Sequence, residues 1–451
     1  MLILSPGNPI RDFTRSLRVR HVLRLGTLVG AQVVRLGLGF VFWLLAARFY
    51  DISEVGLAAS AAAAATLCGL LALLGSGSSI IRLYPTHRQS PLPLVATAAA
   101  IVFFSAILVS CAFVALTRIA FSELSVISTT SFATIFVTLS ILNALSWVSD
   151  ELSIAMKKNV HVLARAVAFG ALTLGTLLFL SLLPGNQGAR TLVASLLVGA
   201  TGSFALAVYQ VSGVIGRSRV PGRRVALAQF LKIGLPNHAL TLADATPIVV
   251  LPLLVTEVLS PEENAVWYVV AMAAFGVYLI PILAGITLFV EAADPRNDVL
   301  TALKLRLKLG LLLGGSGALL IAALAGELLH VLGEGYAENG TTPLRILLIG
   351  IVPVAFSQAY FALSRARGTL LEPILLAAGG AATVLLCATI LGAMYGLIGV
   401  ACAWVGVQLI IGLWSACRLR TFTRQRAPRL TLDDERVGLL HVPPRAPRSE
   451  S

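Results

Sequence analysis

The sequence predicts an all-α integral membrane protein with about twelve transmembrane helices, and three observations support this fold class. Of the 451 residues, 57% are hydrophobic and 12% are charged, with a mean hydropathy of +0.89; soluble domains carry about 25% charged residues. Apolar stretches of about 20 residues, the length that crosses a bilayer, recur along the chain. No polar stretch before the C-terminal tail reaches the roughly 50 residues of a soluble domain.

Twelve spans are expected from these apolar stretches. They lie near residues 22–47, 56–81, 93–117, 125–149, 160–183, 191–216, 226–256, 264–290, 301–325, 342–364, 371–394 and 397–418. The chain is accordingly predicted to comprise a cytoplasmic segment 1–21, a six-helix bundle 22–216, a basic linker 217–225, a second bundle 226–418 and a disordered basic tail 419–451.

The distribution of Lys and Arg predicts how the spans are oriented. The gaps after odd-numbered spans contain only Arg48, Arg118 and Arg190, while the N-terminus, the other gaps and the tail hold the remaining flanking cations. Positive residues favour the cytoplasmic side. This predicts a multi-pass protein of the bacterial inner membrane with both termini in the cytoplasm. The net charge of +13 therefore does not indicate nucleic-acid binding, which requires a basic face with interleaved aromatic residues.

Weak internal similarity suggests a duplication. Residues 22–26 (VLRLG) match residues 230–234 (FLKIG) at an offset of 208, and the turn 51–56 matches 260–265 at nearly the same offset. Two parallel six-span repeats related by an axis along the membrane normal are typical of transporters, with the pathway between the halves.

Three stretches carry a resemblance to a known family. They are residues 46–56 (AARFYDISEVG), residues 233–236 (IGLP) followed by 265–268 (AVWY), and residues 362–368 (ALSRARG) with 395–401 (YGLIGVA). The sequence thereby resembles polysaccharide-repeat-unit flippases of the multidrug/oligosaccharidyl-lipid/polysaccharide (MOP) exporter superfamily. It departs from the family pattern at Ile52-Ser53, where the family has Gly-Pro, and at Ala265, where it has Gly.

The resemblance implies a V-shaped pair of six-helix bundles that alternates between inward-open and outward-open states. It also implies a cargo of oligosaccharide linked to polyprenyl diphosphate, moved from the cytoplasmic to the outer leaflet for cell-surface polysaccharide biosynthesis. The implied partners are membrane lipids, a polysaccharide polymerase, glycosyltransferases and a coupling cation, H⁺ or Na⁺.

Polar residues inside the first span are candidate substrate-binding residues. Arg24 and Arg35 lie about three helical turns apart and share a face with Gln32. Because guanidinium groups bind phosphate oxygens through paired donors, this face suits a diphosphate. The alternative for Arg24 is that its side chain extends to the cytoplasmic headgroups.

Polar residues in the seventh span form a second candidate set. Asn237, Thr241 and Asp244 recur at intervals of four and three residues, on one helix face. The repeat offset places Asp244 next to the counterpart of Arg35. We therefore expect these two charges to pair across the cleft in one state and to separate in another; a permanent structural ion pair is the alternative.

Prolines interrupt the two spans that begin the second half. Pro236, Pro247 and Pro252 lie in span 7 and Pro281 in span 8. Proline removes a hydrogen bond from the helical ladder, so each residue is a candidate hinge or a static kink.

The sequence contains no catalytic set, no phosphate-binding glycine loop and no metal-ligand cluster, so no enzymatic activity, cofactor or metal is predicted. Three alternatives to the flippase remain. Two belong to the same superfamily, a peptidoglycan lipid-precursor flippase and a cation-coupled drug antiporter. The third is a membrane-embedded sugar polymerase or transferase.

Overall fold

The computed structural model of the chain describes residues 9–183, 188–215, 226–293 and 297–424, with side chains from residue 26 onward except 214–215 and 423–424. The predicted linker 217–225 and most of the predicted tail 419–451 lie outside the described residues. The first helix begins at Pro9, inside the segment 1–21 that was predicted to precede the first span.

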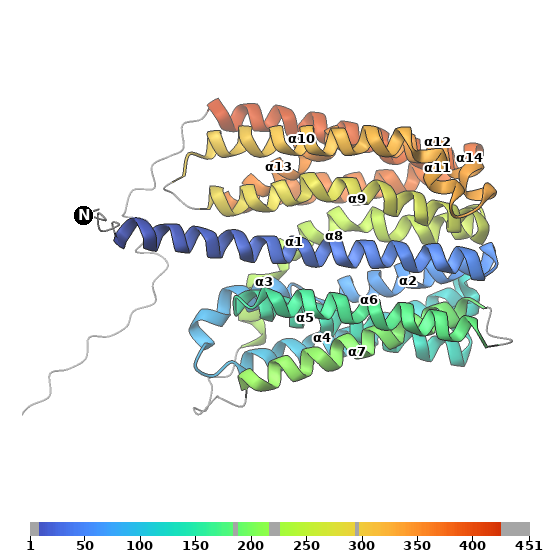
Figure 1. Ribbon diagram of the computed structural model, residues 1–451, viewed down its shortest axis with the longest axis horizontal. Helices are drawn as coiled ribbons and strands as arrows, with labels where there is room; N and C mark the ends of the chain where they lie inside the picture. The colour runs from blue at the N-terminus through green and yellow to red at the C-terminus, as the bar shows by residue number, and fades with distance from the viewer. Residues whose placement is uncertain (1–8, 184–187, 216–225, 294–296, 425–451) are drawn as a thin grey trace, which may run out of the picture.

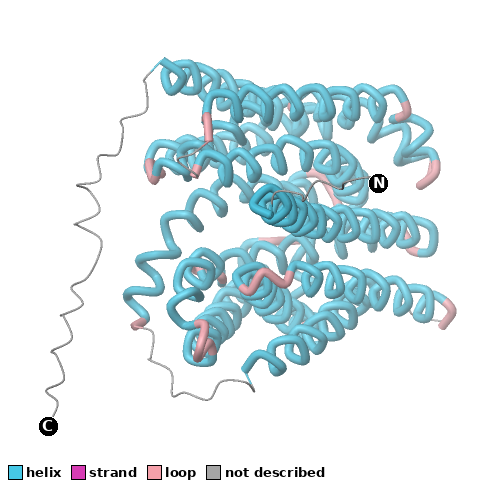
Figure 2. The backbone as a smooth tube through the Cα atoms, turned by 60° about the vertical axis from the view of Figure 1, so that its left-hand side comes forward, coloured by secondary structure: helices cyan, strands magenta, loops and turns pink. Residues whose placement is uncertain are grey.

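Within the described ranges every regular element is helical, which confirms the predicted fold class (Figure 2). The elements are α1 (Pro9–Phe49), α2 (Ile52–Ala72), α3 (Ser76–Leu83), η1 (Tyr84–His87), α4 (Leu92–Ala120), η2 (Glu123–Ser128), α5 (Thr130–Ala155), α6 (Asn159–Ser181), α7 (Ala189–Ile215), α8 (Leu227–Val258), α9 (Pro261–Ala292), α10 (Val299–Ala323), α11 (Ala325–His330), α12 (Glu334–Ile349), α13 (Ile351–Arg367) and α14 (Leu371–Arg424).

The span count follows from these helices. In the described part of the chain, ten helices are long and apolar enough to cross a membrane, and α12 with α13, bent by 44° between them, adds an eleventh span. Large apolar side chains cover their outward faces; Leu108 and Leu319, for example, are 71% and 75% exposed. Such surfaces are compatible with lipid and not with water. The chain is therefore a multi-pass membrane protein.

The helix α14 folds back on itself and supplies the twelfth span. Its backbone is non-helical at Gly396, where φ is +58°, a conformation that glycine adopts without steric cost. Arg418 forms an ion pair with Glu372, and Trp414 Nε1 donates to Glu372 Oε1 at 3.0 Å. In a straight helix residues 46 positions apart would be separated by about 70 Å. The two contacts therefore show that the segments before and after Gly396 lie side by side.

Helices α1–α7 pack mainly among themselves, and so do α8–α14 (Figure 1). The end of the molecule at which α1 begins is called the near end here, and the end at which α1 meets α2 is called the far end. The two groups meet where α2 and α3 pack on α8 and where α2 packs on α9.

The repeat is visible in the contacts between the halves. At the far end, Asn264 Nδ2 donates to Gly56 O at 2.9 Å, and Asn264 directly precedes Ala265, the match of Gly56 in the aligned turns. A Cβ on Gly56 would collide with the carbonyl of Pro261. The matched turns of the two halves touch each other here, so this contact lies close to the pseudo-two-fold axis.

The second predicted span is broken at a position that holds no proline. The chain leaves α2 at Leu74 and Gly75, whose φ angles are +44° and +80°, and then enters α3. By contrast α8 remains helical through Pro236, Pro247 and Pro252, and α9 through Pro281. The helical backbone therefore continues past all four prolines. Their role as hinges remains a prediction.

Candidate functional site

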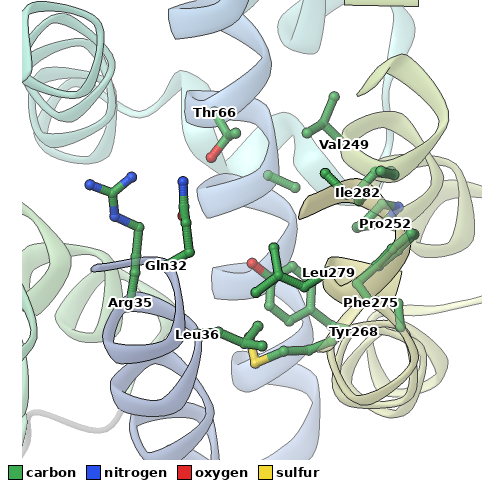
Figure 3. Close-up of a pocket in the computed structure, with 14 residues that line it drawn as sticks. Gln32, Arg35, Leu36, Thr66, Val249, Pro252, Tyr268, Phe275, Leu279 and Ile282 are labelled. Atoms are coloured by element: carbon green, nitrogen blue, oxygen red, sulfur yellow. The ribbon is translucent and has the colours of Figure 1, made fainter. Parts of the chain in front are cut away.

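A cavity of about 420 Å³ lies between the two halves. Its walls come from α1 and α2 in the first half and from α8 and α9 in the second. Gln32 and Arg35 stand together on one side, opposite Phe275, Leu279 and Tyr268 (Figure 3). The full lining is Gln32, Arg35, Leu36, Ala63, Thr66, Ile248, Val249, Pro252, Tyr268, Ala271, Met272, Phe275, Leu279 and Ile282. The cavity thus has a cationic wall and an apolar wall, with no carboxylate in its lining.

Arg35 is the charged residue of this lining. Its guanidinium donates to Asp150 Oδ2 in α5 at 3.0 Å, and its side chain is 36% exposed. A guanidinium has five N–H donors, and this bond uses one of them. Arg35 therefore retains donors for an anionic group in the cavity.

A second arginine binds the carboxylate of Asp150 on the side away from the cavity. Arg165 in α6 donates to Asp150 Oδ1 through Nε at 2.9 Å and through a terminal nitrogen at 2.6 Å. It also donates to Ser149 O, to Ser153 Oγ and to Gln210 Oε1. The side chain of Arg165 is 1% exposed, so it is enclosed by its partners and does not reach the cavity.

The second half repeats this arrangement with different chemistry. Asp244 in α8 accepts a hydrogen bond from Gln358 Nε2 in α13 at 3.0 Å. Gln358 lies 208 residues after Asp150, and Asp244 lies 209 residues after Arg35. Equivalent helices are thus joined by an Arg–Asp pair in one half and by an Asp–Gln pair in the other.

The expected pair between Arg35 and Asp244 is not formed in this structure. Each residue has a partner inside its own half, and Asp244 does not line the cavity. A charge inside a membrane protein requires a close partner, and a residue on a neighbouring helix of the same half supplies one without crossing the cavity. In this state the two charges are therefore separated, and their pairing across the cavity in another state stays a prediction.

The other candidate residues differ in position. Thr241 donates to Asn237 O at 3.2 Å and accepts from Arg365 at 3.3 Å, so it joins α8 to α13. Neither Asn237 nor Thr241 lines the cavity. The side chain of Arg24 lies outside the described residues. Among the candidates of the first half, Gln32 and Arg35 are therefore the two that the structure places at the cavity.

The far end of the interface is closed by polar contacts. Asn264 Nδ2 donates to Ser60 Oγ at 2.8 Å, and the Ser60 hydroxyl lies 2.5 Å from that of Thr256. At the end of α8, Glu257 accepts from the backbone nitrogens of Ser122 and Leu124 at 2.9 and 2.7 Å. These bonds tie α8 and α9 to α2 and η2, which closes the cavity toward the far end.

Within the part of the chain that the structure describes, no group of three or more His, Cys, Asp or Glu side chains is arranged to hold a metal ion. The candidate site is a largely apolar cavity between two helical bundles, with Gln32 and Arg35 on one wall.

No protein-family model and no curated protein matches this sequence. Solved structures do match. An inward-facing multidrug resistance MATE family transporter of the MOP superfamily covers 90% of this chain and 96% of its own length, with 16% identity and a TM-score of 0.63. An outward-facing structure of such a transporter covers 88% and 96%, with 14% identity and a TM-score of 0.63.

A third match is a MOP superfamily transporter from Pyrococcus furiosus, described as having a binding pocket of reverse polarity; it shares 12% identity, covers 90% and 96%, and has a TM-score of 0.62. At these identities the comparison establishes the fold. The chain has the fold of the MATE transporters of the MOP superfamily.

Proposed function

We propose that this protein is an alternating-access transporter that flips an anionic lipid-linked oligosaccharide, carried on polyprenyl diphosphate, across the bacterial inner membrane. The observation that carries the proposal is the two-sided cavity. Arg35 and Gln32 offer hydrogen-bond donors on one wall, while Phe275, Met272 and Leu279 offer an apolar surface on the other. A diphosphate joined to a hydrocarbon chain combines both chemistries.

The charge of the lining favours an anionic cargo over a cationic drug. Arg35 is partly exposed at the cavity and no carboxylate belongs to the lining. A cation-coupled drug antiporter is the second candidate, since one matched structure is described as a multidrug resistance MATE family transporter. A peptidoglycan lipid precursor, which also bears a diphosphate, fits the same cavity. A coupling cation, H⁺ or Na⁺, belongs to the proposal as its driving force.

The direction of transport follows from the predicted topology. With both termini in the cytoplasm, the near end faces the cytoplasm and the closed far end faces outward. The cargo then enters from the cytoplasmic side and leaves when the contacts of Asn264 and Glu257 open. Polymerase and glycosyltransferase partners would act before and after this step in cell-surface polysaccharide biosynthesis.

The test is flipping in proteoliposomes that contain the purified full-length protein and a polyprenyl-diphosphate-linked oligosaccharide. Appearance of the sugar on the opposite leaflet is measured with a glycosidase added outside. We expect Arg35→Gln to reduce the flipping rate at least tenfold, since the diphosphate loses its charged donor. The exposed Arg82, on α3 and away from the cavity lining, supplies the matched control Arg82→Gln.

Two results would overturn the proposal. One is unchanged flipping by Arg35→Gln. The other is transport of an organic cation with no movement of the lipid-linked sugar, which would favour the antiporter.

A further inference from the structure

The carboxylate of Asp150 lies between two guanidinium groups. Its Oδ2 accepts from Arg35 at 3.0 Å, and its Oδ1 accepts from Arg165 at 2.9 and 2.6 Å. One negative and two positive charges leave this cluster of three residues with a net charge of +1. The cluster is held by three helices of the same half, α1, α5 and α6.

The two arginines differ in exposure, and this determines where the surplus charge acts. Arg165 is 1% exposed and Asp150 is 13% exposed, whereas Arg35 is 36% exposed and lines the cavity. Arg165 has further acceptors in Ser149, Ser153 and Gln210. It is therefore fixed in place and cannot contact a cargo.

The arginine behind Asp150 changes what Arg35 can do. Arg35 with Asp150 alone would form a neutral pair that attracts a phosphate weakly. Arg165 offsets the carboxylate charge, so the positive potential of Arg35 persists at the cavity wall. Away from water, where the effective dielectric constant falls, such a charge acts strongly over several ångströms.

The acid that follows Asp150 in the sequence packs against another helix. Glu151, the next residue of α5, lies against α3, since a Cβ built on Gly77 would be 2.8 Å from its Cγ. At the positions that correspond to Asp150 and Arg165, the second half has no charged residue. Gln358 stands at the position of Asp150, and Pro373 stands 208 residues after Arg165.

We propose that Arg165 is a positioning residue that sets the affinity of the cavity for an anionic headgroup without touching it, and that Asp150 limits this affinity. The proposal rests on the anionic cargo proposed above and extends it to residues outside the cavity. It predicts that affinity follows the net charge of the three-residue cluster. A purely structural ion pair between Arg165 and Asp150 would affect stability alone.

The experiment measures binding of farnesyl diphosphate to the purified full-length protein in nanodiscs, with farnesol as the uncharged control. Trp43, whose ring lies 4.9 Å from that of the lining residue Tyr268, supplies a fluorescence signal. Wild type has a cluster charge of +1. Asp150→Asn raises the cluster charge to +2 and should tighten diphosphate binding about tenfold. Arg165→Gln lowers the cluster charge to zero and should weaken binding about tenfold, although Arg35 is still present.

The double variant D150N/R165Q restores the wild-type charge and should bind within about threefold of wild type, a rescue expected from charge arithmetic. Farnesol binding should stay constant in all variants. If R165Q cannot be purified as a folded protein, the affinities of D150N and of the double variant for farnesyl diphosphate are compared instead. The double variant should then bind more weakly than D150N.

The two proposals fail differently. If Arg35→Gln binds farnesyl diphosphate like wild type, the anionic site itself is wrong. If Arg35→Gln loses binding but Asp150→Asn does not gain it, the anionic site stands and the role given to Arg165 is overturned.

Discussion

The two halves contact each other on two sides that the repeat makes equivalent, α3 against α8 and α1 against α9. The packing on these two sides differs. On one side α3 and α8 are in tight contact. A Cβ on Gly234 would collide with the backbone of Gly75, and Ser79 Oγ donates to Phe230 O at 2.5 Å. On the other side, Gly26 of α1 lies 208 residues before Gly234 and has no atom within 4 Å of the position of a Cβ.

The difference traces to one short stretch of backbone. In the first half, the left-handed residues Leu74 and Gly75 end α2 and direct α3 against α8. In the second half, Pro281 stands 208 residues after Leu73 and α9 stays helical. Two halves with one topology therefore form one fixed contact and one sparse contact, in which α1 approaches α9 near Leu36 and Gly276. We expect the sparse side to move during transport.

The largest effect is expected from Gly234→Ala. The new methyl group would overlap the carbonyl oxygen and carbonyl carbon of Gly75, so α3 and α8 must separate. Overpacking of this kind costs about 1–3 kcal/mol or more. The thermal stability of the purified protein should fall clearly. The repeat-equivalent Gly26→Ala is the matched control, because its methyl group enters open space and alanine is the better helix former by about 1 kcal/mol. Equal losses in both variants would remove the distinction between the two sides.

A cross-link tests whether the sparse side moves. In a background in which Cys68, Cys111, Cys387, Cys402 and Cys417 are replaced, Leu36→Cys and Gly276→Cys place two thiols on facing positions of α1 and α9. A Cβ on Gly276 lies 3.2 Å from the Leu36 side chain. We expect oxidation to reduce flipping at least tenfold relative to each single variant under the same oxidation, and reduction to restore it. Unchanged flipping by the cross-linked protein would mean that this side is as static as the other.

The smallest effect is expected from Ser79→Ala. It removes one buried hydrogen bond from the tight side and leaves the Phe230 carbonyl without that partner. A loss of about 1 kcal/mol is typical, measured as a modest fall in melting temperature. Ser181→Ala is the control, since that exposed hydroxyl bonds only to the carbonyl of Leu178 in its own helix. A fall no larger than in the control would show that the hydroxyl is dispensable for holding α3 on α8.

The fold was predictable because its cause is spread over the chain. Each span is specified by about 20 apolar residues, so an error of several residues at a boundary does not change the count. The repeat offset was predictable for the same reason, and Asn264 with Gly56 shows it directly. The break at Leu74 was not predictable, because it depends on two dihedral angles within an apolar stretch.

The candidate site was predictable only in part. Arg35 and Gln32 were recognised because they are polar in mid-span and share a helix face. Asp150 was missed because the fourth span was expected to end at residue 149, whereas α5 continues to Ala155. Because the expected boundary placed Asp150 in a loop exposed to water, no partner was expected for its carboxylate. The separation of Asp150 and Gln358 by 208 residues was the available signal.

The contact between Gly56 and Asn264 has a consequence for the origin of the chain. The matched turns of the two halves touch close to the axis, where a residue without a side chain on one turn meets an amide side chain on the other. In a dimer of identical six-helix subunits, the turns that carry Gly56 and Asn264 would have the same sequence. Joining two gene copies into one reading frame removes this constraint, so each copy can diverge at the shared boundary. The turns 51–56 and 260–265 therefore meet with different sequences, which two identical subunits could not provide.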